Sequence, residues 1–104
     1  MNVRTLNQVV RLLKKAAPHS TIILFGSWAR GEGRADSDID LLVIEQKVRS
    51  RRREMMRLTD ALRPLCVPVD VLVVSQAVFK EWSDIPGTVI YAAAREGKIV
   101  HEAA

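Results

Sequence analysis

Cysteine, histidine and aromatic residues are scarce in this sequence, and each shortage narrows the possible chemistry. Cys66 is the single cysteine, so an intrachain disulfide is excluded and nothing indicates an oxidising compartment. Its apolar neighbours favour an inert thiol in the core. His19 and His101 have no ligand-like spacing to another residue, and we expect both at the surface. Trp28 and Trp82 can stack on a nucleobase, although core or interface packing is the commoner use of such residues.

Long apolar runs are also missing. The longest are strand-sized, and none approaches the roughly 20 residues that span a bilayer. The first residues mix polar with apolar side chains, unlike the continuous apolar core of a signal peptide. We therefore expect a cytoplasmic protein with no membrane partner. The length suits one core, and with 48% hydrophobic and 27% charged residues the chain is expected to form a single folded domain over residues 1–104.

The excess of positive charge is modest but localised. A formal net charge of +4 allows an acidic partner, either a nucleotide or a nucleic acid. The excess is concentrated in Arg49, Arg51, Arg52 and Arg53, around the start of a predicted helix, where the helix dipole favours anions. Either an anionic partner binds there or the cluster is a solvated basic turn. We expect nucleic-acid contact only through this cluster or through a partner protein.

Helical and strand-like patterns alternate along the chain, which predicts an α/β or α+β layer fold. Apolar residues at helical spacing predict an opening helix that Pro18 ends. Ser27 is expected to cap a helix of little more than one turn that begins at Trp28, and Ser50 and Ser75 to cap two later helices. In order, the expected elements are a helix at residues 3–17, a strand at 21–25, the short helix from 28, a strand at 38–45, a helix at 51–63, a strand at 67–74, a helix after 75, a helix from 88 closed by Gly97, and an edge strand at 98–101.

Three aspartates lie in or beside the strand patterns. Asp38 and Asp40 are two residues apart, and the period of two in a strand places both carboxylates on one face of the sheet. Two neighbouring carboxylates repel each other unless a cation lies between them. Asp70 is flanked by valines, where a carboxylate is costly to bury without a compensating charge or metal. Asp38 and Asp40 therefore indicate either a metal site at the margin of the sheet or an ordinary turn and solvated strand end.

Residues suited to phosphate binding precede these aspartates. Gly26 and Ser27 end the apolar run 21–25, and backbone N–H groups there can point at a phosphate. Gly26 permits close approach of the backbone, or serves only as the turn that the chain needs. The Ser27 hydroxyl can donate to a β- or γ-phosphate oxygen. Arg30 lies near enough to touch the phosphates, or alternatively forms a structural salt bridge, for example with Asp36.

The stretch GSWARG at residues 26–31, followed by SDIDLLV at residues 37–43, resembles the signature of the minimal nucleotidyltransferases, the smallest members of the DNA polymerase beta-like superfamily. In that family a Gly-Ser turn and a short helix precede an Asp-x-Asp strand, and a later strand carries a third carboxylate, which Asp70 supplies here. The resemblance implies the nucleotidyltransferase fold, a small mixed β-sheet with helices packed on it.

The resemblance also implies a reaction, in which an acceptor attacks the α-phosphorus of a nucleoside triphosphate, expected to be ATP, and expels pyrophosphate. Two Mg²⁺ ions suit this chemistry because they place positive charge near both the entering and the leaving oxygens. Asp38 and Asp40 are expected to hold the nucleotide-bound metal, and Asp70 to join them at the second. Ser37 is expected to cap or orient the loop that holds Asp38.

Three functional hypotheses remain open at this level. Stand-alone domains of this size resemble the antitoxin half of the HEPN and minimal nucleotidyltransferase pairs, which implies a HEPN toxin as partner in a hetero-oligomer and transfer of AMP to that toxin. In the second hypothesis, the chain is a binding antitoxin that masks the toxin without catalysis. In the third, it is a nucleotidyltransferase that acts on an RNA or a small-molecule acceptor.

Overall fold

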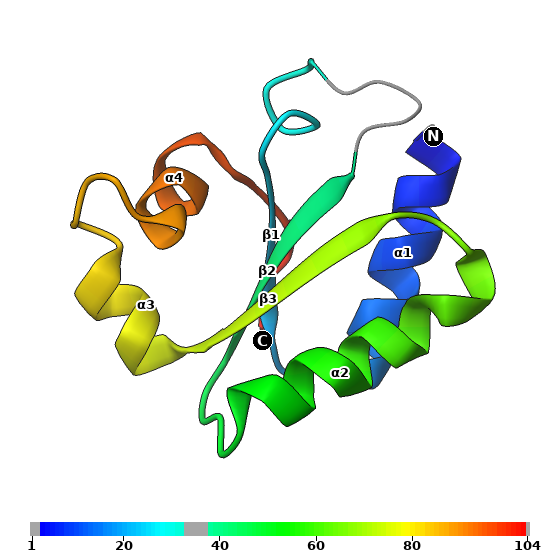
Figure 1. Ribbon diagram of the computed structural model, residues 1–104, viewed down its shortest axis with the longest axis horizontal. Helices are drawn as coiled ribbons and strands as arrows, with labels where there is room; N and C mark the ends of the chain where they lie inside the picture. Colours follow the sequence, from blue (N-terminus) through cyan, green and yellow to red (C-terminus); the bar gives the residue numbers. More distant parts are fainter. Residues whose placement is uncertain (1–2, 33–37, 104) are drawn as a thin grey trace.

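The structure is a computed structural model that describes residues 3–32 and 38–103. Within these residues the chain forms four helices, a short 3-10 turn and four strands, and the strands belong to one mixed sheet (Figure 1). The elements in order are α1 (Val3–Ala16), β1 (Thr21–Phe25), β2 (Ile39–Glu45), α2 (Arg51–Leu62), η1 (Arg63–Leu65), β3 (Val69–Ser75), α3 (Gln76–Trp82), α4 (Val89–Glu96) and β4 (Lys98–His101). The predicted α+β class and the mixed sheet are confirmed.

The strand order of the sheet is β3-β2-β1-β4, so β2 and β1 occupy its centre. β1 runs antiparallel to both of its neighbours, whereas β2 and β3 are parallel. A parallel pair needs a long crossover connection, which α2 provides here. The central strands are apolar on both faces, and β2 is buried from Leu41 to Ile44.

Helices cover both faces of this sheet, but with different pairs. α1 and α2 pack on one face, where Val9, Leu13 and Leu58 meet Leu41 and other side chains of β2 and β3. α3 and α4 lie over the opposite face, and Figure 1 shows the two helix pairs on either side of the sheet. The face under α3 and α4 is the one to which the predicted alternation assigns Asp38 and Asp40. No helix in residues 3–32 and 38–103 has the length and apolar character that a membrane crossing requires.

The helix boundaries follow local chemistry that the sequence reveals. Ser50, Ser75 and Thr88 are N-cap residues, and each side chain accepts a hydrogen bond from the backbone N–H three positions later. Gly97 is the C-cap of α4, as predicted, with an ordinary φ of −75°. A side chain there would clash with Ile23 of β1, so close packing and not a left-handed conformation explains the glycine.

The short helix predicted from Trp28 is wrong. Residues 26–31 form a turn, in which the Arg30 N–H donates to the Gly26 carbonyl at 3.2 Å and the Glu32 N–H donates to the Ser27 carbonyl at 2.9 Å. The second bond spans five residues instead of four, and Gly31 has a φ of 76°, so the helical pattern does not continue. Ser27 therefore begins a compact turn and does not cap a helix.

Cys66 is exposed, which contradicts the prediction of a core thiol. The reason is the 3-10 turn η1 after α2, which Pro64 favours by ending the regular helix. Cys66 follows this turn in a left-handed conformation with φ of 51°, and β3 begins only at Val69, not at Val67 as predicted. The cysteine thus precedes the sheet and is not part of its core.

Candidate active site

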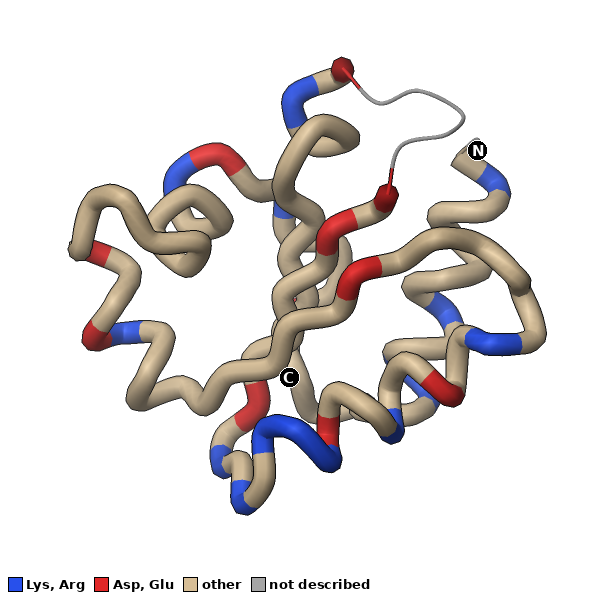
Figure 2. The backbone as a smooth tube through the Cα atoms, viewed as in Figure 1, with Lys and Arg blue, Asp and Glu red and all other residues tan. Residues whose placement is uncertain are grey.

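Strand pairing brings the predicted aspartates together at one end of the sheet. Asp40 and Asp70 are direct partners in the parallel β2–β3 pair. Asp38 lies two residues before Asp40, immediately ahead of the strand. Figure 2 shows the acidic stretches of β2 and β3 next to each other. Asp38 and Asp70 are exposed and Asp40 is half-buried, so the group is open to solvent along its outer side.

Asp40 is at the electrostatic centre of this group. Burial raises the pKa of its carboxyl above the usual range, and the negative charges of Asp70 and then Asp38 raise the pKa further. The positive charge of Arg30 acts in the opposite direction. Because like charges that meet at one place disfavour ionisation, an added cation would relieve this repulsion.

The donor set of this group is made of carboxylate oxygens. Within residues 3–32 and 38–103, no three acidic, histidine or cysteine side chains already stand close enough to form a complete metal-ligand cluster. Mg²⁺ does not need one, because it usually keeps several waters and binds one or two carboxylates together with substrate phosphates. The repulsion around Asp40 and the all-oxygen donors of Asp38 and Asp70 therefore fit Mg²⁺ that arrives with a nucleotide.

Gly26 leaves the space that Asp40 occupies. It follows β1 directly after Phe25, and Phe25 is the antiparallel partner of Asp40. A Cβ atom at Gly26 would clash with Oδ2 of Asp40, and the residue also has a φ of 77°. Glycine is thus required both for the backbone conformation and for the position of the carboxylate. The sequence predicted a turn at Gly26, but this contact became visible only once the strands were paired.

The turn after β1 carries the other predicted nucleotide-binding residues. Ser27 is half-buried and lies one residue beyond Gly26, at the same end of the sheet as the aspartates. Arg30 forms ion pairs with Glu32 at 3.3 Å and with Glu96 of α4 at 3.7 Å. Such exposed pairs are weak, so they leave Arg30 able to turn to a phosphate. Ser37, and Asp36, which was weighed as a partner of Arg30, lie outside the described residues.

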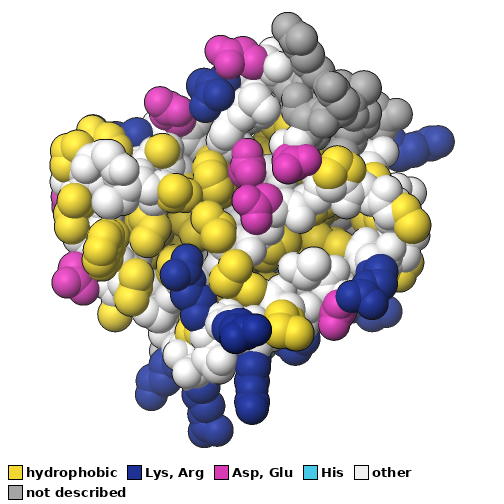
Figure 3. All heavy atoms as spheres, in the orientation of Figure 1, with side chains coloured by type: hydrophobic (Ala, Val, Ile, Leu, Met, Phe, Trp, Pro, Cys, Tyr) yellow, Lys and Arg dark blue, Asp and Glu magenta, His cyan; other side chains and the backbone are white. Residues whose placement is uncertain are grey.

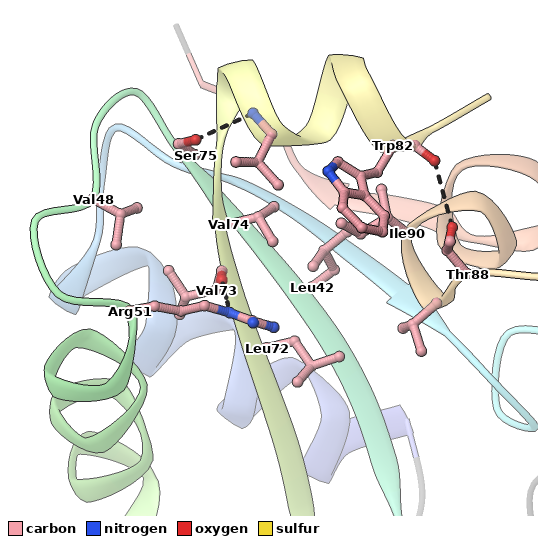
Figure 4. A pocket seen from close by; sticks show the side chains of 12 residues that line it. Leu42, Val48, Arg51, Leu72, Val73, Val74, Ser75, Trp82, Thr88 and Ile90 are labelled. Atoms are coloured by element: carbon pink, nitrogen blue, oxygen red, sulfur yellow. Dashed lines mark hydrogen bonds between the residues drawn. The ribbon is translucent and has the colours of Figure 1, made fainter. Parts of the chain in front are cut away.

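An apolar cavity adjoins the aspartates, and the sequence did not reveal it. Its volume is about 600 Å³, and it lies between the sheet and the helices α3 and α4 (Figure 4). Leu42 and Leu72 line it, each two residues after Asp40 or Asp70 and therefore on the same face of its strand. Figure 3 shows the acidic side chains beside a broad apolar surface. In the sequence, the apolar residues of α3 and α4 resemble ordinary core positions. Only the structure shows that their side chains are exposed around the cavity.

The predicted basic cluster borders two surface hollows. Arg51 lines the apolar cavity, where its Nε donates to the Val73 carbonyl at 2.9 Å. Arg51 and Arg52 also line a second depression along α2 together with Met56. All four arginines of the cluster are exposed. Among these four arginines, Arg51 is the one that lines the cavity on the face that carries the aspartates.

Comparison with protein families gives one match. A family model described as "Polymerase beta, Nucleotidyltransferase" matches residues 7–103. No curated protein sequence matches the chain.

Several solved structures share this fold, among them the three that follow. A candidate minimal nucleotidyltransferase is 30% identical, and the match covers 94% of this chain and 95% of that chain with a TM-score of 0.61. A candidate nucleotidyltransferase from Sulfolobus solfataricus is 19% identical over 95% of this chain and 78% of that one, with a TM-score of 0.65. A chain from the complex of a tri-AMPylated Shewanella oneidensis HEPN toxin with an MNT antitoxin is 21% identical over 98% and 73%, with a TM-score of 0.54.

Proposed function

Because this chain belongs to the polymerase beta nucleotidyltransferase family, whose model spans residues 7–103, we propose that it transfers AMP from ATP, with Mg²⁺, to a HEPN-type toxin as the antitoxin of the pair. The register that sets Asp40 opposite Asp70, with Asp38 two residues before, carries this proposal. It places three carboxylates at one open end of the sheet, where a nucleotide and its metal ions can enter.

Each residue of the site has a distinct role in this reaction. Asp38 and Asp40 would hold the nucleotide-bound metal, and Asp70 would join them on the acceptor side. When bound, Mg²⁺ supplies the positive charge that the entering and leaving oxygens need. Gly26 keeps the space for the Asp40 carboxylate, and the Ser27 hydroxyl donates to a phosphate oxygen.

In the reaction step, the acceptor hydroxyl oxygen forms a bond to the α-phosphorus while the bond from that phosphorus to the bridging oxygen of pyrophosphate breaks. In this proposal the acceptor hydroxyl loses its proton at Asp70, either directly to the carboxylate or through the metal that Asp70 would help to hold, and the pairing of Asp70 with Asp40 across β2 and β3 supports this role. Arg30 balances charge on the phosphates once its weak ion pairs release.

The partner is proposed from the family and from a shared fold. The solved complex of an MNT antitoxin with an AMPylated HEPN toxin contains a chain of this fold, which supports a hetero-oligomer with a toxin of that class. A cytoplasmic location and a single catalytic domain over residues 1–104 belong to the same proposal. A masking antitoxin is the second candidate, because exposed apolar side chains such as Trp82 and Val89 offer a binding surface that needs no catalysis.

One labelling experiment tests the proposal. The protein is incubated with α-labelled ATP, Mg²⁺ and the protein encoded beside it, and the wild type is compared with Asp38→Asn and Asp70→Asn. We expect label on the neighbour with the wild type, and none with either variant or after the metal is chelated. If both variants still neutralise the neighbour and no label is transferred, masking is the function. If only RNA or a small molecule becomes labelled, the acceptor belongs to the third class of hypothesis.

A further inference from the structure

The cavity between the sheet and the helices α3 and α4 lies next to the candidate active site on the same face of the sheet. Its floor includes Leu42 and Leu72, which are partners across β2 and β3. The next partners along the same face are Asp40 and Asp70. A molecule that lies in the cavity along these strands therefore ends beside the carboxylates.

The walls of the cavity expose large apolar side chains. Val78 and Trp82 of α3 are 37% and 43% exposed, and Val89 of α4 is 50% exposed. All three line the cavity, which also has the size of pockets that hold whole ligands. Single exposed apolar residues are ordinary, but several around one hollow mark an interaction site. Figure 4 shows Trp82 over Leu42 and Ile90 at this site.

Arg51 adds a single positive charge to this apolar surface. Among the residues that the structure describes, it is the one charged residue that lines the cavity. Its Nε is held by the Val73 carbonyl at 2.9 Å, and Figure 4 shows the rest of the guanidinium extending along the sheet toward Leu72. A guanidinium that is already positioned loses little freedom when it pairs with a carboxylate, so it favours an acidic group.

These surroundings suit a protein segment better than a nucleotide. Phosphates require several N–H donors or cations. The cavity is lined mainly by apolar side chains, with one arginine and the hydroxyl groups of Ser75 and Thr88, which already accept from backbone N–H groups as the caps of α3 and α4. An amphipathic segment with apolar anchors and one acidic residue matches both the apolar walls and Arg51. Its position would also bring an adjacent hydroxyl toward Asp70.

We propose that this cavity docks an amphipathic segment of the acceptor protein, with apolar side chains between Trp82 and Val89 and a carboxylate on Arg51. The inference rests on the proposed function, because it names how the acceptor of that reaction is held. It assigns the nucleotide to the turn after β1 and the acceptor to the cavity, on opposite sides of the aspartates.

Binding without ATP tests this assignment. The affinity of the purified chain for the protein encoded beside it is measured by calorimetry, with Trp82→Glu and Val89→Glu as test variants. Ile99→Glu is the matched control, since Ile99 is 58% exposed on β4 and lies outside the cavity. We expect about a tenfold loss of affinity for each test variant and little change for the control. Thermal unfolding checks that all variants fold.

Arginine variants test the predicted ion pair. Arg51→Ala is expected to weaken binding several-fold, whereas Arg52→Ala, which removes the same charge one residue away, is expected to change it little. Both variants and Trp82→Glu should still bind a fluorescent ATP analogue with wild-type affinity.

The possible failures are distinct. If the Trp82 and Val89 variants bind the neighbour as the wild type does while label transfer continues, the docking inference is overturned and the proposed function stands. If these variants lose the ATP analogue and keep the neighbour, the cavity holds the nucleotide, which also overturns the inference. If the wild type binds no neighbour at all, both the inference and the proposed antitoxin role fail.

Discussion

Gly26 shows how one residue without a side chain controls the position of a functional carboxylate. In Gly26→Ala, the new Cβ would clash with Oδ2 of Asp40, and the backbone would keep a φ of 77° that costs an L-residue roughly 1–2 kcal/mol. We expect lower thermal stability and a loss of nucleotidyl transfer of at least about a hundredfold, because small displacements of reacting groups have effects of that order. Label transfer and unfolding temperature measure the two effects.

Gly31 provides the matched control for this substitution. Its φ of 76° is nearly the same, but among the described residues no atom lies within 4 Å of the position that a Cβ would take. Gly31→Ala should therefore lose a similar amount of stability and retain most of its activity. Equal loss of activity in the two variants would show that backbone strain, and not the Asp40 contact, accounts for the effect.

Asp40 is expected to reduce stability in the absence of a cation. Burial, Asp70 and Asp38 raise its pKa above 3.8, so its ionised form is disfavoured in the folded state. The protonated Asp40 carboxyl contributes stability below the pKa that it has in the unfolded chain. This contribution is lost as pH rises through the higher pKa of the folded protein, so ionised Asp40 destabilises the fold at neutral pH. In a chelator, Asp40→Asn should melt at a higher temperature than the wild type.

Added Mg²⁺ and ATP should reverse that order. The wild type gains binding free energy that the unfolded chain lacks, whereas the variant gains less because it has one charged ligand fewer. Asp60→Asn is a suitable control, since Asp60 is exposed on α2 and is paired with Arg63. A larger ligand-induced shift in Asp40→Asn than in the wild type would contradict a cation site at Asp40.

At the scale of elements, the sequence was informative wherever local chemistry decides the structure. Apolar periodicity located the three long strands and the helices, and Ser50 and Ser75 marked helix starts because their caps involve residues only three positions away. The carboxylate face was predictable because β-strands alternate with a period of two. The close approach of Gly26 to the Asp40 carboxylate was not predictable, because it depends on how β1 and β2 pair.

The turn at residues 26–31 and the apolar cavity were also not predictable, because both depend on contacts that local sequence patterns do not reveal. Residues 26–31 had a plausible helical pattern, but a bond across five residues and the positive φ of Gly31 closed a turn instead. The cavity joins Leu42 of β2 to Val89 of α4. Nothing in either segment alone indicates that their side chains line the same hollow.

Helix α2 is tied to its neighbours by a pair of carboxyl groups and an arginine. Arg57 donates from Nη2 and Nε to Glu54 at 2.6 and 2.8 Å and from Nη1 to the Ala16 carbonyl at 2.9 Å, which links α2 to the end of α1. Arg57 lowers the pKa of Glu54 to about 2. Glu45, at the end of β2, has an enclosed Oε2, and burial followed by the adjacent Glu54 raises its pKa to about 7.

The raised pKa of Glu45 predicts that its contribution to the free energy of unfolding falls as pH rises. The contribution of Glu45 is fully present below its unfolded pKa of 4.5 and is lost as pH rises through about 7. Glu45→Gln should remove this decline and be more stable than the wild type at about pH 8, by about 1 kcal/mol after solvent screening. Urea unfolding of both proteins at about pH 5 and pH 8 measures the difference. A parallel pH dependence in the two proteins would rule out Glu45 as its source.

At the scale of the whole molecule, the two signs of charge gather at different places. Figure 2 shows acidic stretches of β2 and β3 at one end of the sheet and basic stretches around the start of α2 at the other. The chain has 16 basic and 12 acidic residues, so its excess of +4 is small, and the distribution of charge matters more than its sum. A partner with acidic surface is therefore attracted to the α2 side and can be oriented before it reaches the aspartates.

Removing charge from this side should slow association. In the triple variant Arg49→Ser, Arg52→Ser and Arg53→Ser, we expect the association rate with the neighbouring protein to fall about tenfold at low salt, with little change in dissociation. The difference from the wild type should shrink as salt approaches about 0.5 M, because exposed charges are screened. Arg51 is left intact, so the proposed ion pair in the cavity is not altered. Stopped-flow or surface-based kinetics at several salt concentrations measures both rates.

A second triple variant distinguishes the effect of where the positive charge lies from the effect of how much positive charge the chain carries. Arg11, Lys14 and Lys15 are exposed on α1, and their replacement by serine lowers the net charge by the same amount at a different place. If steering depends on where the partner first meets the molecule, this control should slow association much less. Equal slowing in the two triple variants would mean that net charge alone governs the encounter, and the α2 side would then have no special part in orienting the partner toward Asp70.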